Sequence, residues 1–221
     1  MIQSNSDLMK NVYHYLNAEN SIKAEADNLS HHIKLHRDNW GFTLWDGNDV
    51  QLKRNDIIRQ NDNLLVEYLE DIVNNTNKSP TPIKMESLEN VVLTQGMSES
   101  IDRDIGASST ALDYCSLGTS STAEAESQTD LQTEFTDTAY ARLQFSTAGQ
   151  RQRVNQTMRL GVLWNDTNFD SVPVTIREAG VHWHLSDASK CHARVVSSDF
   201  SMASGNLFVV QINELQANGT V

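Results

Sequence analysis

The stretch MRLGVLW at residues 158–164 carries apolar side chains at every second position: Met158, Leu160, Val162 and Trp164. A period of two is typical of a β-strand, because successive side chains point to opposite faces of a sheet. The same alternation occurs at residues 139–145 and 181–185, and residues 195–196 and 207–210 are apolar on both faces, as central strands are. The C-terminal part is therefore predicted to be mostly antiparallel β, a sandwich or a small open barrel.

The N-terminal part of the chain carries a helical pattern instead. Alternating steps of four and three residues lead from Leu8 to Trp40 along a heptad a/d track, which the polar residues Glu19 and His36 interrupt. Such a track predicts one of two structures. The first is an amphipathic helix pair that packs on its own domain, and the second is a self-associating helix of the coiled-coil type. In the second case the oligomer contact would use Leu8, Val12, Tyr15, Ile22, Ala26, Leu29 and Ile33.

Between these parts the pattern changes twice. Residues 42–52 predict a short hairpin around a turn at Asp46-Gly47, and Asn55 is a candidate N-cap for a helix that continues to Val73. The Asn, Ser and Pro content of residues 74–82 then indicates a linker. We predict an α+β fold in which residues 1–77 are a helical oligomerisation or docking region, 78–82 a linker and 83–221 a β-sandwich.

The 221 residues carry a formal net charge of −12, which bears on the partners of the chain. Neutralising nucleic-acid phosphates requires clustered Lys and Arg, and the local basic cluster is limited to Arg151, Arg153 and Arg159. We therefore expect no nucleic-acid binding. No run approaches the roughly 18 apolar residues that span a membrane, and residues 1–10 lack the basic and apolar regions of a signal peptide. We also expect no membrane association.

Cys115 and Cys191 both lie in apolar contexts. Two cysteines can form a disulfide or remain free, and buried free thiols are typical of a protein made in a reducing cytoplasm. We predict free thiols.

Three histidines are the candidates for a metal site. His182 and His184 flank Trp183 in a predicted strand and would point to the same face, and His-x-His in a strand is a geometry that zinc accepts. His192, beside Cys191, is the nearest further ligand. The alternative, which we favour, places these histidines on a solvated face while Trp183 fills the core. We accordingly predict no metal and no cofactor.

The sequence carries no recognised catalytic motif. It contains no Gly-x-Ser-x-Gly elbow, no GxGxxG and no phosphate-binding Gly-rich loop with a lysine. Acidic pairs such as Asp102 with Asp104 lie in polar connectors, where nothing would raise a carboxyl pKa for general acid catalysis. We predict no catalytic residues and no enzymatic activity.

An ordered series of short stretches resembles a β-domain that recurs in tail, fibre and neck structural proteins of tailed bacteriophages. The matching stretches are NVVLTQG at 90–96, YCSLGTSST at 114–122, LQTEF at 131–135, TIREAGV at 175–181, ARVV at 193–196 and LFVVQI at 207–212. Within them, Gly180 fits a close backbone approach or a positive φ. Glu178 and Arg194 are either a pair across strands or two unrelated surface charges.

This resemblance implies a non-enzymatic virion component, assembled in the host bacterial cytoplasm and placed at the tail, neck or fibre base. The implied partners are other copies of the chain, with a trimer favoured, and portal, tail, fibre or capsid proteins. A capsid-surface head fibre or decoration protein is the nearest alternative. A carbohydrate-binding receptor module is a further one, which would need exposed aromatic side chains such as Trp164, Trp183 and Tyr140.

Overall fold

The computed structural model describes residues 39–50, 81–154, 157–186 and 191–215. These residues belong to one compact unit, Arg37–Leu215. The predicted oligomerisation positions from Leu8 to Ile33, the predicted helix after Asn55 and most of the predicted linker lie outside the described residues. Within the described part, no helix is long and apolar enough to cross a membrane.

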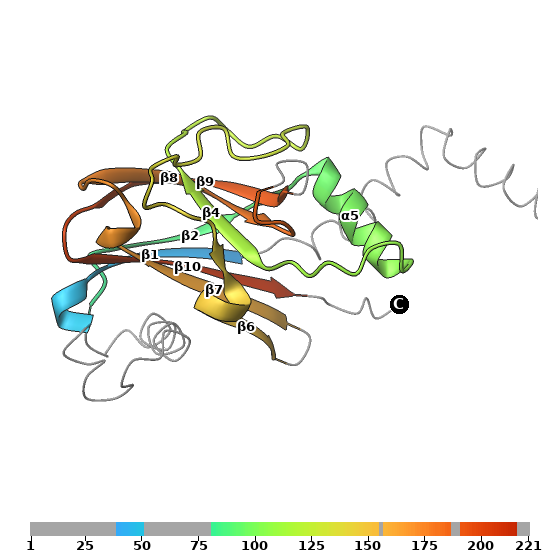
Figure 1. Cartoon of the computed structure of the whole chain (residues 1–221), viewed down its shortest axis with the longest axis horizontal. Helices are drawn as coiled ribbons and strands as arrows, with labels where there is room; N and C mark the ends of the chain where they lie inside the picture. Colours follow the sequence, from blue (N-terminus) through green and yellow to red (C-terminus); the bar gives the residue numbers. More distant parts are fainter. Residues whose placement is uncertain (1–38, 51–80, 155–156, 187–190, 216–221) are drawn as a thin grey trace, which may run out of the picture. The chain divides into compact units, whose positions relative to one another are not determined.

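Ten described strands form two five-stranded sheets (Figure 1). Within each sheet, every pair of neighbouring strands is antiparallel. The first sheet has the order β2 (Lys84–Glu89), β1 (Asn39–Asp46), β10 (Asn206–Leu215), β7 (Thr157–Asn165), β6 (Gly149–Val154). The second has the order β3 (Val91–Val92), β9 (Cys191–Met202), β8 (Val174–His182), β4 (Tyr114–Gly118), β5 (Leu143–Gln144). The described helices are α5 (Thr94–Asp104), the single turn α6 (Phe145–Ala148), the 3₁₀ turn η1 (Asp166–Asn168) and a helical turn at residues 47–50.

The core lies between the two sheets. Phe42 of β1 and Phe208 of β10 meet Phe200 of β9, with ring centroids 5.4–5.9 Å apart and the rings edge to face. Edge-to-face contacts of this kind add to the gain from burying the rings. Trp40 and Trp164 are also buried in this core, so the two sheets form a sandwich with an aromatic centre.

The predicted α+β fold with an N-terminal helical region is wrong for the described part of the chain. β1 lies inside residues 1–77, and Trp40, the last position of the heptad track, is one of its buried core residues. β1 pairs with β10 on one side and β2 on the other, so it is an internal strand of the sandwich. The sequence placed Trp40 in the heptad track and the residues from Phe42 onward in a hairpin, whereas β1 contains both.

The predicted strands have mixed outcomes. Residues 158–164, 195–196 and 207–210 lie in β7, β9 and β10, as predicted. The alternation at 139–145 gives only the two-residue strand β5, because Phe145 begins α6. The predicted hairpin at 42–52 is also wrong, since β1 finds its partners far along the chain and residues 47–50 form a helical turn.

A long connection joins β4 to β5 and positions the site described below. We call residues 119–142 the β4–β5 loop. It runs over the outer side of the second sheet (Figure 1) and folds back on itself, because the Thr119 amide donates to the Thr133 carbonyl (2.9 Å) and the Phe135 amide to the Leu117 carbonyl (3.1 Å). The loop therefore covers a sheet face that would otherwise meet solvent.

Candidate functional site

The outer face of the second sheet is polar and buried. Strand alternation sends Leu117 and Val195 into the core between the sheets, whereas Ser116, Glu178 and Arg194 point to the other side. These three side chains have no exposed surface, because the β4–β5 loop covers them. Burying polar groups is costly unless each one finds hydrogen-bond partners, so the contacts here decide what the site is.

The first group of contacts, the Arg194 cluster, centres on a fully buried ion pair. Arg194 Nε on β9 donates to Glu178 Oε2 on β8 at 2.6 Å, and both side chains have zero exposed area. The remaining guanidinium nitrogens donate to Gln128 Oε1 (3.0 Å) and to the Thr122 carbonyl (2.9 Å), both in the loop. Two of the three guanidinium nitrogens of Arg194 therefore donate hydrogen bonds to the loop.

Glu178 binds the loop from the other end of the pair. Its Oε1 accepts hydrogen bonds from the backbone amides of Ser120 (3.3 Å) and Thr133 (2.7 Å), and its Oε2 accepts one from Gln132 (3.1 Å). Hydrogen bonds to an ionised acceptor are the stronger kind. The pairing of Glu178 with Arg194 that the sequence left open is thus present, as a buried pair rather than two surface charges.

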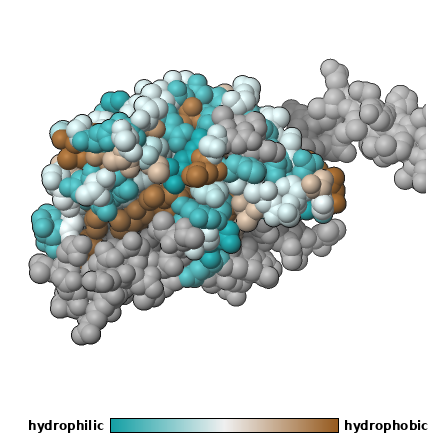
Figure 2. Space-filling view, viewed as in Figure 1, coloured by the Kyte–Doolittle hydropathy of each residue, from teal (hydrophilic) through white to brown (hydrophobic). Residues whose placement is uncertain are grey.

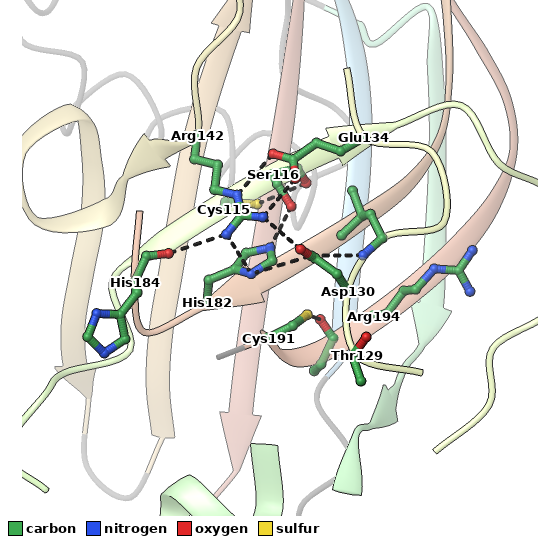
Figure 3. Close-up of polar contacts among 12 residues, drawn as sticks. Cys115, Ser116, Thr129, Asp130, Glu134, Arg142, His182, His184, Cys191 and Arg194 are labelled. Atoms are coloured by element: carbon green, nitrogen blue, oxygen red, sulfur yellow. Dashed lines mark hydrogen bonds and ion pairs between the residues drawn. The ribbon is translucent and has the colours of Figure 1, made fainter. Parts of the chain in front are cut away.

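The second group of contacts, the Arg142 cluster, lies beside the first (Figure 3). Arg142, near the end of the loop, donates through Nη2 to Asp130 (3.0 Å) and Glu134 (2.7 Å) and through Nε to Glu134 (2.9 Å). Its Nη1 reaches His182 Nδ1 at 3.0 Å and the His184 carbonyl at 3.3 Å. The Arg142 guanidinium therefore links Asp130 and Glu134 of the loop to His182 and His184 at the end of β8.

His182 is held as a neutral donor. Arg142 has no acceptor, so Nδ1 of His182 must accept the hydrogen bond from Nη1, and the ring proton then resides on Nε2. Nε2 lies 2.7 Å from Ser116 Oγ and donates to it. Burial and the adjacent Arg142 charge both lower the pKa of His182 well below 6.5, which keeps the ring neutral.

Ser116, His182 and Asp130 are arranged like the members of a serine-hydrolase triad but have other roles. Asp130 Oδ1 lies 3.7 Å from His182 Nδ1, on the opposite side of the ring from Ser116. A catalytic base must take the serine proton through Nε2, whereas here Nε2 already carries a proton and Arg142 opposes a second charge. Ser116 also has no exposed surface for a substrate to reach. The geometry defines a structural hydrogen-bond chain.

The same region contains the one metal-like group found among the described residues. Single ligand atoms of Asp130, His182 and Cys191 lie within 4.8 Å of one another. Arg142 already donates to both His182 and Asp130, so its positive charge competes with any cation for these atoms. Burial also raises the pKa of the Cys191 thiol well above its usual value, which disfavours the thiolate that a metal needs. In this arrangement Arg142 supplies the cation that the acidic groups require.

The three histidines proposed as metal candidates from the sequence do not come together. His182 joins the Arg142 cluster, His184 contributes its carbonyl to Arg142, and the His192 ring packs edge-on against Trp183 at 4.7 Å. The prediction that His182 lies on a solvated face is wrong, because the β4–β5 loop seals that face. Trp183 is buried as predicted, although β8 ends at His182. Cys115 and Cys191 are buried free thiols, also as predicted.

Sequence reasoning missed Arg142, Asp130 and Ser116. Arg142 lies within the alternating stretch 139–145, and Asp130 lies in a polar stretch with several other acidic residues, so neither carries a distinctive signal. Glu134 was noticed only within the Leu-x-x-Glu stretch. The spacing of these residues along the chain carries no signal of their meeting, since an irregular loop brings them together.

The fold and this site define a β-sandwich in which the β4–β5 loop covers the polar outer face of the second sheet and is held there by the Arg194 and Arg142 clusters. Comparisons of the chain with protein-family models, with curated proteins and with solved structures found no match.

Proposed function

We propose that this chain is a non-enzymatic structural component of a tailed-bacteriophage virion, at the tail, neck or fibre base. The observation that carries the proposal is the position of the residues behind the resemblance. Stretches that are far apart in the sequence meet at the β4–β5 loop: Glu178 of TIREAGV pairs with Arg194 of ARVV and binds the amides of LQTEF. Residues of that series serve to hold a loop on a sheet, which is an architectural role.

Two glycines of the same stretches support this interpretation. A Cβ at Gly118 would lie 2.4 Å from the Thr133 carbonyl oxygen, and one at Gly180 would lie 2.2 Å from Leu131 Cδ1. At Gly118 the close neighbour is backbone, so only glycine lets the loop approach the sheet there, whereas at Gly180 a side chain would have to displace the end of the Leu131 side chain. Neither has a positive φ, so the close approach accounts for them. A rigid domain with a fixed outer loop suits a protein that joins parts of a particle.

The carbohydrate-binding alternative loses the feature that suggested it. Trp164 and Trp183 are buried, and Tyr140 packs against Phe135 and Phe169 with centroid distances of 5.7 and 6.2 Å. Sugar recognition of that kind requires exposed aromatic faces, and the exposed large apolar side chains among the described residues are isoleucine, methionine and leucine. We therefore retain the virion proposal, with other copies of the chain and other virion proteins as partners.

The test is quantitative mass spectrometry of particles purified by density gradient from a lysate of the virus that encodes the chain. The proposal predicts that the chain co-sediments with particles at a fixed ratio to the capsid protein that persists through repeated gradients. An abundant viral enzyme from the same lysate is the control for adhering protein. A ratio that falls with each gradient, as the control's should, would refute the proposal.

A further inference from the structure

Helix α5 packs with its polar face inward and its apolar face outward. Gly96 and Glu99 are buried, whereas the exposed fractions of Met97, Ile101 and Ile105 are 43%, 57% and 72%. We call these three side chains the α5 stripe. They recur every four residues and so form one row along the helix, with Ile105 at its C-cap. Figure 2 shows apolar atoms at the α5 end of the molecule, at the right of the view.

Specific contacts on the inner side fix this inverted orientation. A Cβ at position 96 would lie 2.2 Å from the His192 carbonyl oxygen, so only glycine lets the helix approach β9 here. Gln95 donates to the Cys191 carbonyl at 3.2 Å, and Ser108 donates to the buried Glu99 carboxylate at 2.5 Å. Rotating the helix to bury the stripe would break these contacts. The stripe therefore faces outward in the folded unit.

A row of large apolar side chains at this spacing is the form in which a helix presents itself to an apolar partner surface. Isolated exposed apolar residues are common on protein surfaces. Three of them in one row on a helix whose buried face is polar form a continuous apolar patch, and such patches mark interaction sites. At 100° per residue, Asp102 and Asp104 lie on opposite sides of the stripe, and both are exposed. The stripe thus has an acidic border on each side.

The acidic borders determine what kind of partner fits. A second copy of the chain, stripe to stripe, would bring the aspartates of both copies together and join two molecules of net charge −12. A partner with apolar side chains flanked by Lys or Arg would pair with both parts of the surface. We propose that the α5 stripe is a docking surface for a basic amphipathic helix of a different protein. This inference is independent of the proposed virion function.

The experiment uses the full chain and a labelled synthetic peptide with leucines at the a and d positions of its heptads and lysines elsewhere. A peptide of the same composition in scrambled order controls for simple charge attraction. Fluorescence anisotropy should show that the amphipathic peptide binds and that Ile101→Ser weakens it about tenfold, equal to about 1.4 kcal/mol. Leu185→Ser, at a site of similar exposure outside the stripe, should leave the affinity unchanged.

A double variant, Asp102→Asn with Asp104→Asn, should weaken binding and reduce its dependence on salt, whereas Glu126→Gln should do neither. Equal binding of the two peptides, or no effect of Ile101→Ser, would overturn the proposal. Light scattering provides a further outcome. A mass that rises with concentration in the wild type but not in Ile101→Ser would show that the stripe binds a second copy, and that would also overturn it.

Discussion

Replacing Glu178 by glutamine changes the buried ion pair by a single group of nearly the same size. The carboxylate accepts two donors on each oxygen: the Ser120 and Thr133 amides on Oε1, and the Gln132 amide and Arg194 Nε on Oε2. A glutamine has one acceptor oxygen and one NH₂ group. Whichever way the amide is turned, its NH₂ group faces two donors, and Arg194 loses its counter-charge.

The magnitude follows from the burial of both partners. Arg194 has no exposed surface, so in the variant its charge stays buried without a compensating carboxylate. Removing one member of a buried pair costs about 3–5 kcal/mol of unfolding free energy. For a unit of this size each kcal/mol lowers the Tm by about 2–4 °C, so we expect a fall of roughly 6–20 °C.

The neighbouring pair Arg177–Asp199 provides a matched control. It joins the same two strands at a similar distance, 2.7 Å, but Asp199 is 64% exposed. Exposed ion pairs contribute little, so Asp199→Asn should change the unfolding free energy far less than Glu178→Gln. Urea unfolding of the two variants provides the comparison. A loss below about 1 kcal/mol in Glu178→Gln would refute the claim that this pair holds the loop. The double variant Glu178→Gln with Arg194→Met should lose less unfolding free energy than the sum of the losses of the two single variants.

Four further predictions concern the core, the Arg142 cluster, its dependence on pH and the fragment limits. Trp183→Ala should cost about 3–5 kcal/mol in urea unfolding, because the ring is buried; a loss under 1 kcal/mol, on the order of a surface change, would contradict this. His182→Gln should be clearly more destabilising than His184→Ala, since only the first removes buried partners of Ser116 and Arg142. The folded pKa of His182 lies below its unfolded value of 6.5, so its contribution is complete above that pH and declines as the pH falls below it. Wild type should lose about 1 kcal/mol more than His182→Gln between about pH 7.5 and 5.5, and equal losses would refute the buried neutral ring. Residues 83–221 expressed alone should lack the cooperative thermal transition of Arg37–Leu215, since they lack β1; equal transitions would show that β1 is dispensable.

The sequence predicted the strands that contain either the alternation at 158–164 or a run of residues apolar on both faces. β7 alternates apolar and other residues over 158–164, and β10 contains the continuous apolar run 207–210, which is rich in β-branched and aromatic residues. Part of β1 was predicted as extended, but as one arm of a local hairpin, because its first core residue, Trp40, also completed a heptad track. Helix α5 was missed because its apolar residues face outward and its buried face contains glycine and glutamate. Periodicity does not reveal which face of such a helix is buried.

The site was harder to predict than the sandwich. Pairing of Glu178 with Arg194 was one of two alternatives that the sequence left open, but the burial of the pair depends on the loop above it. The sequence gives no means of placing a loop of polar residues over a sheet face. For that reason His182 was expected to meet solvent, and Arg142 was not connected with Asp130 at all.

The most direct test of the proposed function is electron microscopy of particles assembled with a chain that carries a gold-binding tag. We expect gold on the particles at the tail, neck or fibre base, in a symmetric arrangement that recurs from particle to particle. Gold in the host cytoplasm with none on assembled particles would contradict it.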